Sequence, residues 1–249
     1  MTEDTGLPAS IEMAWGLRER PTKGPKRGLS LEQIVDAGVR VATAEGIGAV
    51  SMNRVAGELG TSAMSLYRYV ASKDELLWLM IDGAFGQVDT PPPAEGTWRE
   101  RLEQWARHEL AALRQFPWVL RIPIFSAPLM PHQLRFMEWG LRALGGTTLA
   151  EGEKMSVLLL ITSYTRSYAG LSGDIMAAVE AGSPLAQAAD YGALIKKLTA
   201  ADEFPALHAA VDGGAFEDED DPADALDYDF RFGLDRIFDG VAALIRVRE

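Results

Sequence analysis

Residues 51–76 carry side chains whose chemistry suits contact with DNA. Small, hydroxyl, aromatic and cationic groups recur there, while the apolar Leu66 and Val70 fall at helical spacing. A helix that buries those two residues presents the other groups outward, where they match the base edges and phosphates of a major groove. The candidate DNA contacts are Ser51, Arg54, Thr61, Ser62, Ala63, Met64, Ser65, Tyr67, Arg68, Tyr69 and Lys73.

Two short helices around a tight turn must position these groups. Val55, Ala56 and Leu59 recur at helical spacing before Gly60, a residue that allows the positive φ of a tight stop. Thr61 or Ser62 can cap the second helix. Ser72 and Glu75 then form an S-x-x-E capping box, which predicts the start of another helix and a terminus that suits a phosphate.

The sequence G-T-S-x-x-S-L-Y-R-Y-V-x-S-K-D-E-L over residues 60–76 resembles the DNA-binding region of the tetracycline-repressor (TetR) family. The resemblance is clearest over residues 29–79. It implies an all-α fold with an N-terminal three-helix helix-turn-helix domain and a larger helical domain for ligand binding and dimerisation. A helical hairpin that does not bind DNA is the alternative, because Ala and Gly at such positions also occur in ordinary hairpins.

Three segments are expected: a flexible basic arm over residues 1–28, the helix-turn-helix domain over 29–73, and an effector-binding and dimerisation domain over 74–249. The arm can lie in a minor groove or along phosphates, or remain a solvated tail. Both readings stay open at this point. The cations in question are Arg18, Arg20, Lys23, Lys26 and Arg27.

Charge is divided unevenly along the chain. Residues 15–73 hold nine Lys and Arg against five Asp and Glu, a net charge of +4, whereas the whole chain carries −12, which leaves −16 for the remainder. A basic reading domain on an acidic body fits a DNA-binding protein. The acidic run over residues 217–221 lacks the order of a calcium loop, so we expect a solvated connector and no metal there.

Other protein classes lack their signatures. The sequence has no cysteine, no apolar run long enough to span a bilayer and no recognisable secretory leader, so we expect a cytoplasmic protein without a membrane partner. Phosphate-binding, hydrolase and di-iron motifs are missing too, so we expect no enzyme and no cofactor. His108, His132 and His208 do not pair at ligand spacing, which argues against a tetracycline–magnesium site.

Aromatic and methionine residues gather in the helices expected between residues 97 and 181. Each of them fits a plain core, but together they fall in the part of the chain where TetR-like proteins hold an effector cavity, and such cavities are mostly apolar with a few polar anchors. The candidate ligand contacts are Trp105, His108, Arg121, Met137, Trp139, Tyr164, Arg166 and Tyr168.

Two long apolar helices, near residues 151–181 and 228–247, can complete the core or form a homodimer interface. Dimerisation is favoured, since one recognition helix reads only a few base pairs. The predicted function is a ligand-responsive transcriptional regulator, most often a repressor in this family, that leaves its DNA operator when a small apolar or aromatic effector binds. The alternative is a helical ligand-binding protein or enzyme whose hairpin does not bind DNA.

Overall fold

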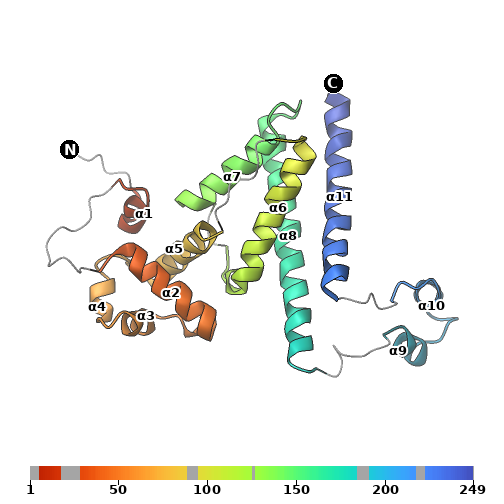
Figure 1. Cartoon of the computed structure of the whole chain (residues 1–249), viewed down its shortest axis with the longest axis horizontal. Coiled ribbons are helices and arrows are strands. Elements are labelled where there is room, and N and C mark those ends of the chain that lie inside the picture. Colours follow the sequence, from red (N-terminus) through yellow and green to blue (C-terminus); the bar gives the residue numbers. More distant parts are fainter. Residues whose placement is uncertain are drawn as a thin grey trace. The chain divides into compact units, whose positions relative to one another are not determined.

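The computed structural model describes residues 6–17, 29–88, 95–124, 127–183, 191–216 and 222–248. All regular secondary structure in these residues is helical, with no strand among them (Figure 1). They form two compact units, one within Met1–Arg166 and Leu244–Glu249 and the other within Ser167–Ala243. No helix in the described ranges is long and apolar enough to cross a membrane. The expected all-α fold is confirmed.

The first unit begins with a helix-turn-helix domain that rests on a longer helix. Its elements are α1 (Ala9–Ala14), α2 (Leu31–Glu45), η1 (Ile47–Ala49), α3 (Met52–Glu58), α4 (Ala63–Leu66) and α5 (Lys73–Gly86). A capping box starts α2: Ser30 Oγ accepts from the Gln33 amide at 3.1 Å and the Gln33 side chain accepts from the Ser30 amide at 3.0 Å. Gly60 takes the predicted positive φ of 64° between α3 and α4.

Close helix packing joins α2 to α5. A Cβ on Gly38 would lie 2.6 Å from Met80 Sδ, and a Cβ on Gly83 would lie 2.7 Å from Val35 Cγ1. Such distances are too short for any side chain but hydrogen, so the two glycines let the helices approach. The helix-turn-helix domain therefore packs directly on α5.

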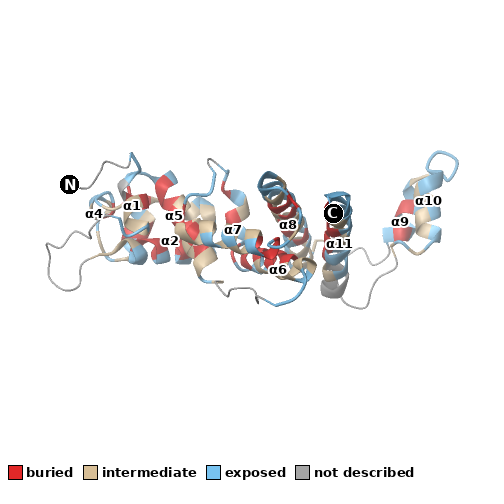
Figure 2. Ribbon diagram, turned by 90° about the horizontal axis from the view of Figure 1, so that it is seen from above, coloured by how far each residue is buried: buried red, intermediate tan, exposed pale blue. Residues whose placement is uncertain are grey.

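The rest of the first unit surrounds the far half of α5. It comprises α6 (Trp98–Gln115), η2 (Pro117–Arg121), α7 (Pro131–Ala143), the part of α8 (Glu151–Glu180) up to Arg166, and the end of α11 (Pro222–Arg248). Thr97 caps α6 and forms a full capping box with Glu100. Buried residues run along α5, α6 and α8 (Figure 2).

The second unit contains the remainder of α8 and α11 together with α9 (Tyr191–Leu198) and α10 (Pro205–Asp212). Tyr168 packs on Phe230 with ring centroids 5.2 Å apart, and Phe230 is fully buried. Lys196 and Asp212 join α9 to α10 through an ion pair of 2.6 Å. The acidic run over residues 217–221 lies outside the described residues.

One part of the expected flexible arm is ordered. Residues 9–14 form α1, and Ser10 and Ile11 are buried. The helix forms because Ile11 can pack on the body and Ser10 finds a polar partner there, contacts that local sequence does not reveal. The arm cations Arg18, Arg20, Lys23, Lys26 and Arg27 lie outside the described residues.

Candidate functional site

The predicted recognition helix is short and presents its polar groups outward. Helix α4 ends at Leu66, after which a turn leads to Val70, and both of these residues are fully buried. Met64 and Tyr67 are 77% and 49% exposed, and Arg68 is exposed beside them. Ser62 Oγ and Ser65 Oγ are 3.1 Å apart. The exposed groups can thus approach a groove, while the two apolar residues hold the segment in place.

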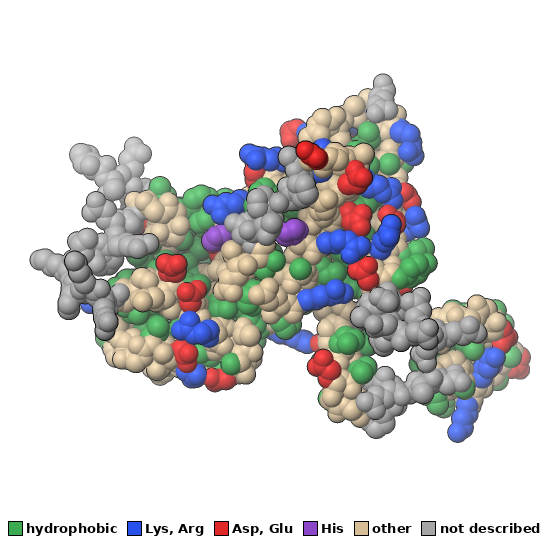
Figure 3. Space-filling model, viewed as in Figure 1, with side chains coloured by type: hydrophobic (Ala, Val, Ile, Leu, Met, Phe, Trp, Pro, Cys, Tyr) green, Lys and Arg blue, Asp and Glu red, His purple; other side chains and the backbone are tan. Residues whose placement is uncertain are grey.

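Ser51 and Arg54 are engaged within the domain. Ser51 Oγ caps α3 by accepting from the Arg54 amide at 3.1 Å. The Arg54 guanidinium pairs with Glu45 at 2.5 Å and Glu58 at 3.1 Å. Acidic and basic side chains lie next to one another on this part of the surface (Figure 3). Its hydrogen bond holds the pKa of the Glu45 carboxyl below the usual range. A phosphate contact by Arg54 stays a prediction, and it would compete with these carboxylates.

The start of α5 combines a cap with a long-range contact. Ser72 Oγ accepts from the Glu75 amide at 3.1 Å, as predicted, and Lys73 is exposed at the first helical position. The Glu75 carboxyl does not return to the Ser72 amide. It accepts instead from the Ala71 amide and from Ser10 Oγ of α1, and Glu75 is only 6% exposed. Glu75 therefore ties α1 to the turn between α4 and α5.

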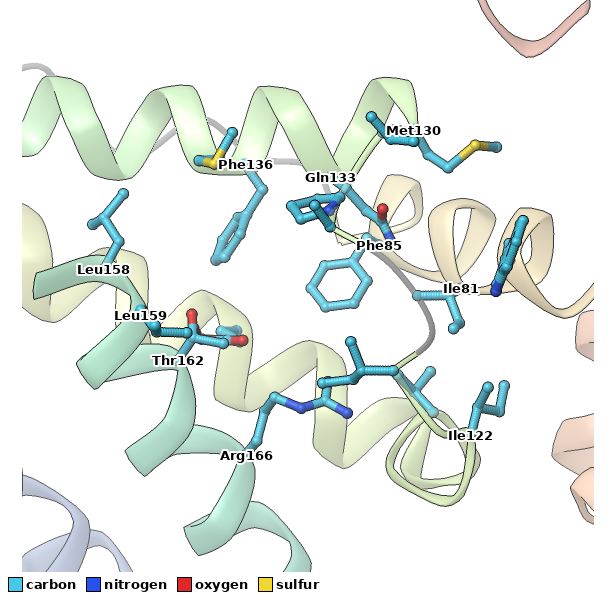
Figure 4. A pocket seen from close by; sticks show the side chains of 18 of the residues that line it. Ile81, Phe85, Ile122, Met130, Gln133, Phe136, Leu158, Leu159, Thr162 and Arg166 are labelled. Atoms are coloured by element: carbon cyan, nitrogen blue, oxygen red, sulfur yellow. Dashed lines mark hydrogen bonds between the residues drawn. The ribbon is translucent and has the colours of Figure 1, made fainter. Parts of the chain in front are cut away.

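A cavity of about 590 Å³ lies within the first unit and is mostly apolar (Figure 4). Trp105 stacks on Phe136 with centroids 4.7 Å apart, and Phe85 lies 5.8 Å from the same ring. Its size and lining suit a small organic molecule with aromatic or aliphatic rings. The lining comprises Ile11, Trp78, Ile81, Phe85, Trp105, Glu109, Val119, Ile122, Pro123, Ile124, Ala127, Pro128, Leu129, Met130, Gln133, Phe136, Met137, Met155, Ser156, Leu158, Leu159, Thr162 and Arg166.

The eight predicted ligand contacts are placed differently. Trp105, Met137 and Arg166 line the cavity. His108 and Trp139 line a separate cavity of about 20 Å³ that shares Phe85 and Phe136 with it. The other three lie outside both linings: Arg121 is exposed in η2, Tyr164 is half-buried on α8, and Tyr168 packs on Phe230 in the second unit.

Glu109 and Thr162 are cavity residues that the sequence reasoning missed. Glu109 lies on the apolar stripe of α6, one turn after Trp105, and is 3% exposed. Thr162 Oγ1 donates to Glu109 Oε2 at 3.1 Å. Burial raises the pKa of the Glu109 carboxyl to about 7, against the lowering effects of the Thr162 hydrogen bond and the Arg166 charge. The sequence feature that could have identified Glu109 is its carboxyl group at a position within an otherwise apolar stripe of the helix.

Helix α5 forms one wall of the cavity and also holds α7. Trp78, Ile81 and Phe85 of α5 line the cavity. Asp82, which is buried, accepts from the backbone amides of His132 and Gln133 at 3.0 Å each, and its other oxygen lies 2.9 Å from His132 Nδ1. Asp82 thereby caps the N-terminus of α7 from a neighbouring helix. Gln133, in the same capped turn, lines the cavity.

Helix α1 forms another part of the wall. Ile11 lines the cavity, and Trp15 Nε1 donates to the Leu129 carbonyl oxygen at 2.9 Å. Since Ser10 binds Glu75, this one short helix contacts both the cavity lining and the start of α5. Among the residues that the structure describes, no three His, Asp or Glu side chains gather as a metal site would require.

Two family models match the chain. Residues 34–78 match the model of bacterial regulatory proteins of the TetR family, and residues 90–245 match the model of the tetracycline repressor-like C-terminal domain. The first match covers the helix-turn-helix and the start of α5. The second covers α6 to α11, including most of the cavity.

Individual relatives agree with the family models. The chain is 35% identical to the HTH-type transcriptional repressor DrrR1 of Streptomyces coeruleorubidus, over 99% of this chain and 91% of that protein. It also resembles crystal structures of ActR from Streptomyces coelicolor. The complex with actinorhodin has a TM-score of 0.73 at 28% identity and covers 87% of this chain and 97% of that one. Apo ActR has a TM-score of 0.69 at 28% identity and covers 86% and 95%. The predicted resemblance is confirmed, and the chain belongs to the TetR family of transcriptional regulators.

Proposed function

We propose that the protein is a ligand-responsive repressor that leaves its DNA operator when a small apolar or aromatic molecule occupies the cavity. One observation carries the proposal. Helix α5 begins at Lys73, directly after the recognition segment, and its residues Trp78, Ile81 and Phe85 form a wall of the cavity. A ligand that displaces these side chains moves the same helix on which the reading domain rests.

The energetic requirement is modest. A ligand shifts a conformational equilibrium only by its difference in affinity for the two states, and couplings between sites are typically ~1–3 kcal/mol. Packing against Ile81 and Phe85 is enough to supply such a difference, because apolar burial contributes about 25 cal/mol per Å². The ligand therefore needs to fit the cavity better when α5 has moved.

On the DNA side, we assign base reading to the small face of α4 and backbone contact to the segment that follows it. Ala63, Met64 and Ser65 lie where base edges would be approached. Tyr67, Arg68 and Lys73 are exposed and would contact phosphates, together with the hydroxyls of Thr61 and Ser62 and the ring of Tyr69. Changes at Met64 or Ser65 should alter the preferred sequence, and changes at Tyr67 or Lys73 should weaken binding to all sequences.

A homodimer would give two recognition helices about one helical turn of DNA apart. Large apolar side chains remain exposed on α8 and α11, and they support these helices as the interface. They are Leu159, Leu160, Leu171 and Ile175 on α8, and Tyr228, Phe232, Leu244 and Val247 on α11.

The relatives support both halves of the proposal. DrrR1 is a transcriptional repressor, and ActR structures hold actinorhodin or (S)-DNPA. The cavity described above offers this chain a place for a small-molecule effector.

Selection of bound fragments from random DNA tests the DNA half. We expect the wild-type chain to enrich one sequence. Replacing Tyr67, Arg68 and Lys73 with Ala should lower affinity for it about 100-fold, as loss of several phosphate contacts does. The matched control replaces Arg142 and Lys197 with Ala. It removes two positive charges from exposed positions, the same number as the triple substitution removes.

The alternative of a helical protein that does not bind DNA gives a different result. It predicts no enriched sequence, or residual binding that the control substitutions weaken as much as the triple substitution does. Adding a panel of small aromatic molecules to the enriched complex then tests release. An effector should free the DNA and also raise the melting temperature of the protein alone.

A further inference from the structure

Arg166 faces the cavity from α8. Its guanidinium points into the cavity from α8 (Figure 4). Among the described residues it makes no hydrogen bond and no ion pair, although its charge acts on Glu109. A half-buried guanidinium carries five N–H donors, and leaving them unmet beside apolar side chains is unfavourable. The position is therefore suited to an acceptor that enters with a ligand.

Glu109 does not meet this need. Its Oε2 accepts from Thr162 at 3.1 Å, and among the described residues Arg166 acts on Glu109 through its charge, without a hydrogen bond. Burial raises the pKa of this carboxyl to about 7, so near neutral pH much of it is protonated and can itself donate a hydrogen bond. Donors from α6 and α8 thus converge on one end of the cavity.

The rest of the lining contains no competing charge. Of the described lining residues, only Glu109 and Arg166 have acidic or basic side chains. The other polar side chains of the lining are those of Gln133, Ser156 and Thr162. His108 and His132 line the adjoining small cavity. The remaining surface is aromatic or aliphatic. A complementary ligand therefore has one acidic end and an apolar ring system.

We propose that the effector is an aromatic carboxylic acid whose carboxylate binds Arg166, with Glu109 and Thr162 beside it and its rings among Trp105, Phe136 and Phe85. We name Glu109, Thr162 and Arg166 the polar pole of the cavity. Arginine binds a carboxylate through two parallel hydrogen bonds, which fix its direction as well as its charge. The inference rests on the proposed function, because it assumes that this cavity is the effector site.

Two probes of equal shape test the inference: anthracene-2-carboxylic acid and anthracene-2-carboxamide. Their affinities for the full chain are measured by titration calorimetry at pH 6.5. We expect the acid to bind about 10- to 100-fold more tightly than the amide, the range for a hydrogen bond to a charged group. Arg166→Gln should remove the preference, Arg166→Lys should retain part of it, and the exposed control Arg142→Gln should leave it unchanged.

Equal binding of acid and amide by the wild type would overturn the inference, as would a preference that survives Arg166→Gln or the absence of any binding by the acid. The wild-type ratio decides the matter even if Arg166→Gln does not fold. Affinity for the enriched DNA fragment is measured on the same samples without probe. Loss of the acid preference with intact DNA binding refutes only this inference, whereas a wild type that binds no DNA refutes the proposed function.

Discussion

Two buried glutamates of the first unit, Glu75 and Glu109, have opposite surroundings. Glu75 lies where α1, the turn before α5 and α5 itself meet, and it accepts from a backbone amide and a serine hydroxyl. Glu109 is more deeply buried, faces a cavity and, among the residues that the structure describes, accepts from the Thr162 hydroxyl alone. The contrast teaches that burial of a carboxyl does not define its role. A buried carboxyl whose two oxygens both accept hydrogen bonds holds structural elements together. A buried carboxyl that has fewer hydrogen bonds and lies beside a cavity is suited to contact a ligand.

The largest expected effect is the pH dependence that Glu109 gives to stability. Its pKa rises from the ordinary value of 4.5 to about 7 in the folded protein, so between these values the folded state holds a proton that the unfolded chain has lost. The free energy of unfolding should therefore fall by about 2–3 kcal/mol as the pH rises from about 4.5 to about 7. Glu109→Gln should remove this loss.

Urea unfolding of wild type and Glu109→Gln at pH 5 and pH 8 measures the effect, at one fixed protein concentration because of dimerisation. The variant should gain stability relative to the wild type at pH 8. A difference between the two proteins that is the same at both pH values would mean that Glu109 is not the titrating group.

The same substitution at the other glutamate should have the opposite sign. Glu75→Gln removes the negative charge that strengthens both hydrogen bonds, and its NH₂ group can face Ser10 only if that hydroxyl turns to accept. We expect a loss of about 2 kcal/mol in the free energy of unfolding at pH 8, where Glu109→Gln is stabilising. Urea unfolding of the two variants side by side measures this. If both substitutions changed the free energy of unfolding in the same direction, Glu75 and Glu109 would not have the different roles described here.

Asp82 extends the comparison to the contact between α5 and α7. Asp82→Ala leaves the His132 and Gln133 amides without their acceptor and should lower the free energy of unfolding by about 1–2 kcal/mol, as loss of a helix cap does. Glu138→Ala, at an exposed surface ion pair, serves as the control and should change it by less than about 1 kcal/mol. If the two variants lost the same free energy of unfolding, Asp82 would not act as a helix cap.

The smallest effect is expected at Ser10. Ser10→Ala removes one hydroxyl donor to Glu75 and should lower the free energy of unfolding by about 1 kcal/mol. Because α1 also lines the cavity through Ile11, probe binding should weaken along with stability. Calorimetry with the anthracene acid checks this, and an unchanged affinity would separate α1 from the ligand site.

The sequence predicted those parts of the fold that depend on near neighbours. The Ser72 cap and the turn at Gly60 formed as predicted, and the caps at Ser30 and Thr97 have the same short spacing, because each needs only residues three or four positions away. Ser62 stands at the N-cap of α4 as predicted, but its side chain accepts no hydrogen bond from a backbone amide there. The Glu75 side chain does not complete the predicted capping box, because it accepts from Ser10, which lies 65 residues away in the sequence. Helix α1 was missed for the same reason.

The candidate sites divide in a similar way. Leu66 and Val70 were predicted to be buried and Met64 and Tyr67 to be exposed, because helical spacing fixes the faces of the segment. In the body, spacing identified aromatic stripes but not which residues face one cavity. Tyr168 therefore lies on Phe230, whereas Glu109 came to the cavity through the packing of α6 on α8, which depends on contacts between distant segments.

Ligand control of DNA binding is tested most directly by one affinity measured twice. The dissociation constant of the wild-type protein for its enriched DNA fragment is determined without ligand and again at saturation with a compound that calorimetry shows to bind the cavity. Coupling through α5 predicts that the bound compound weakens DNA binding about 5- to 150-fold. An unchanged dissociation constant at full occupancy of the cavity would contradict the account.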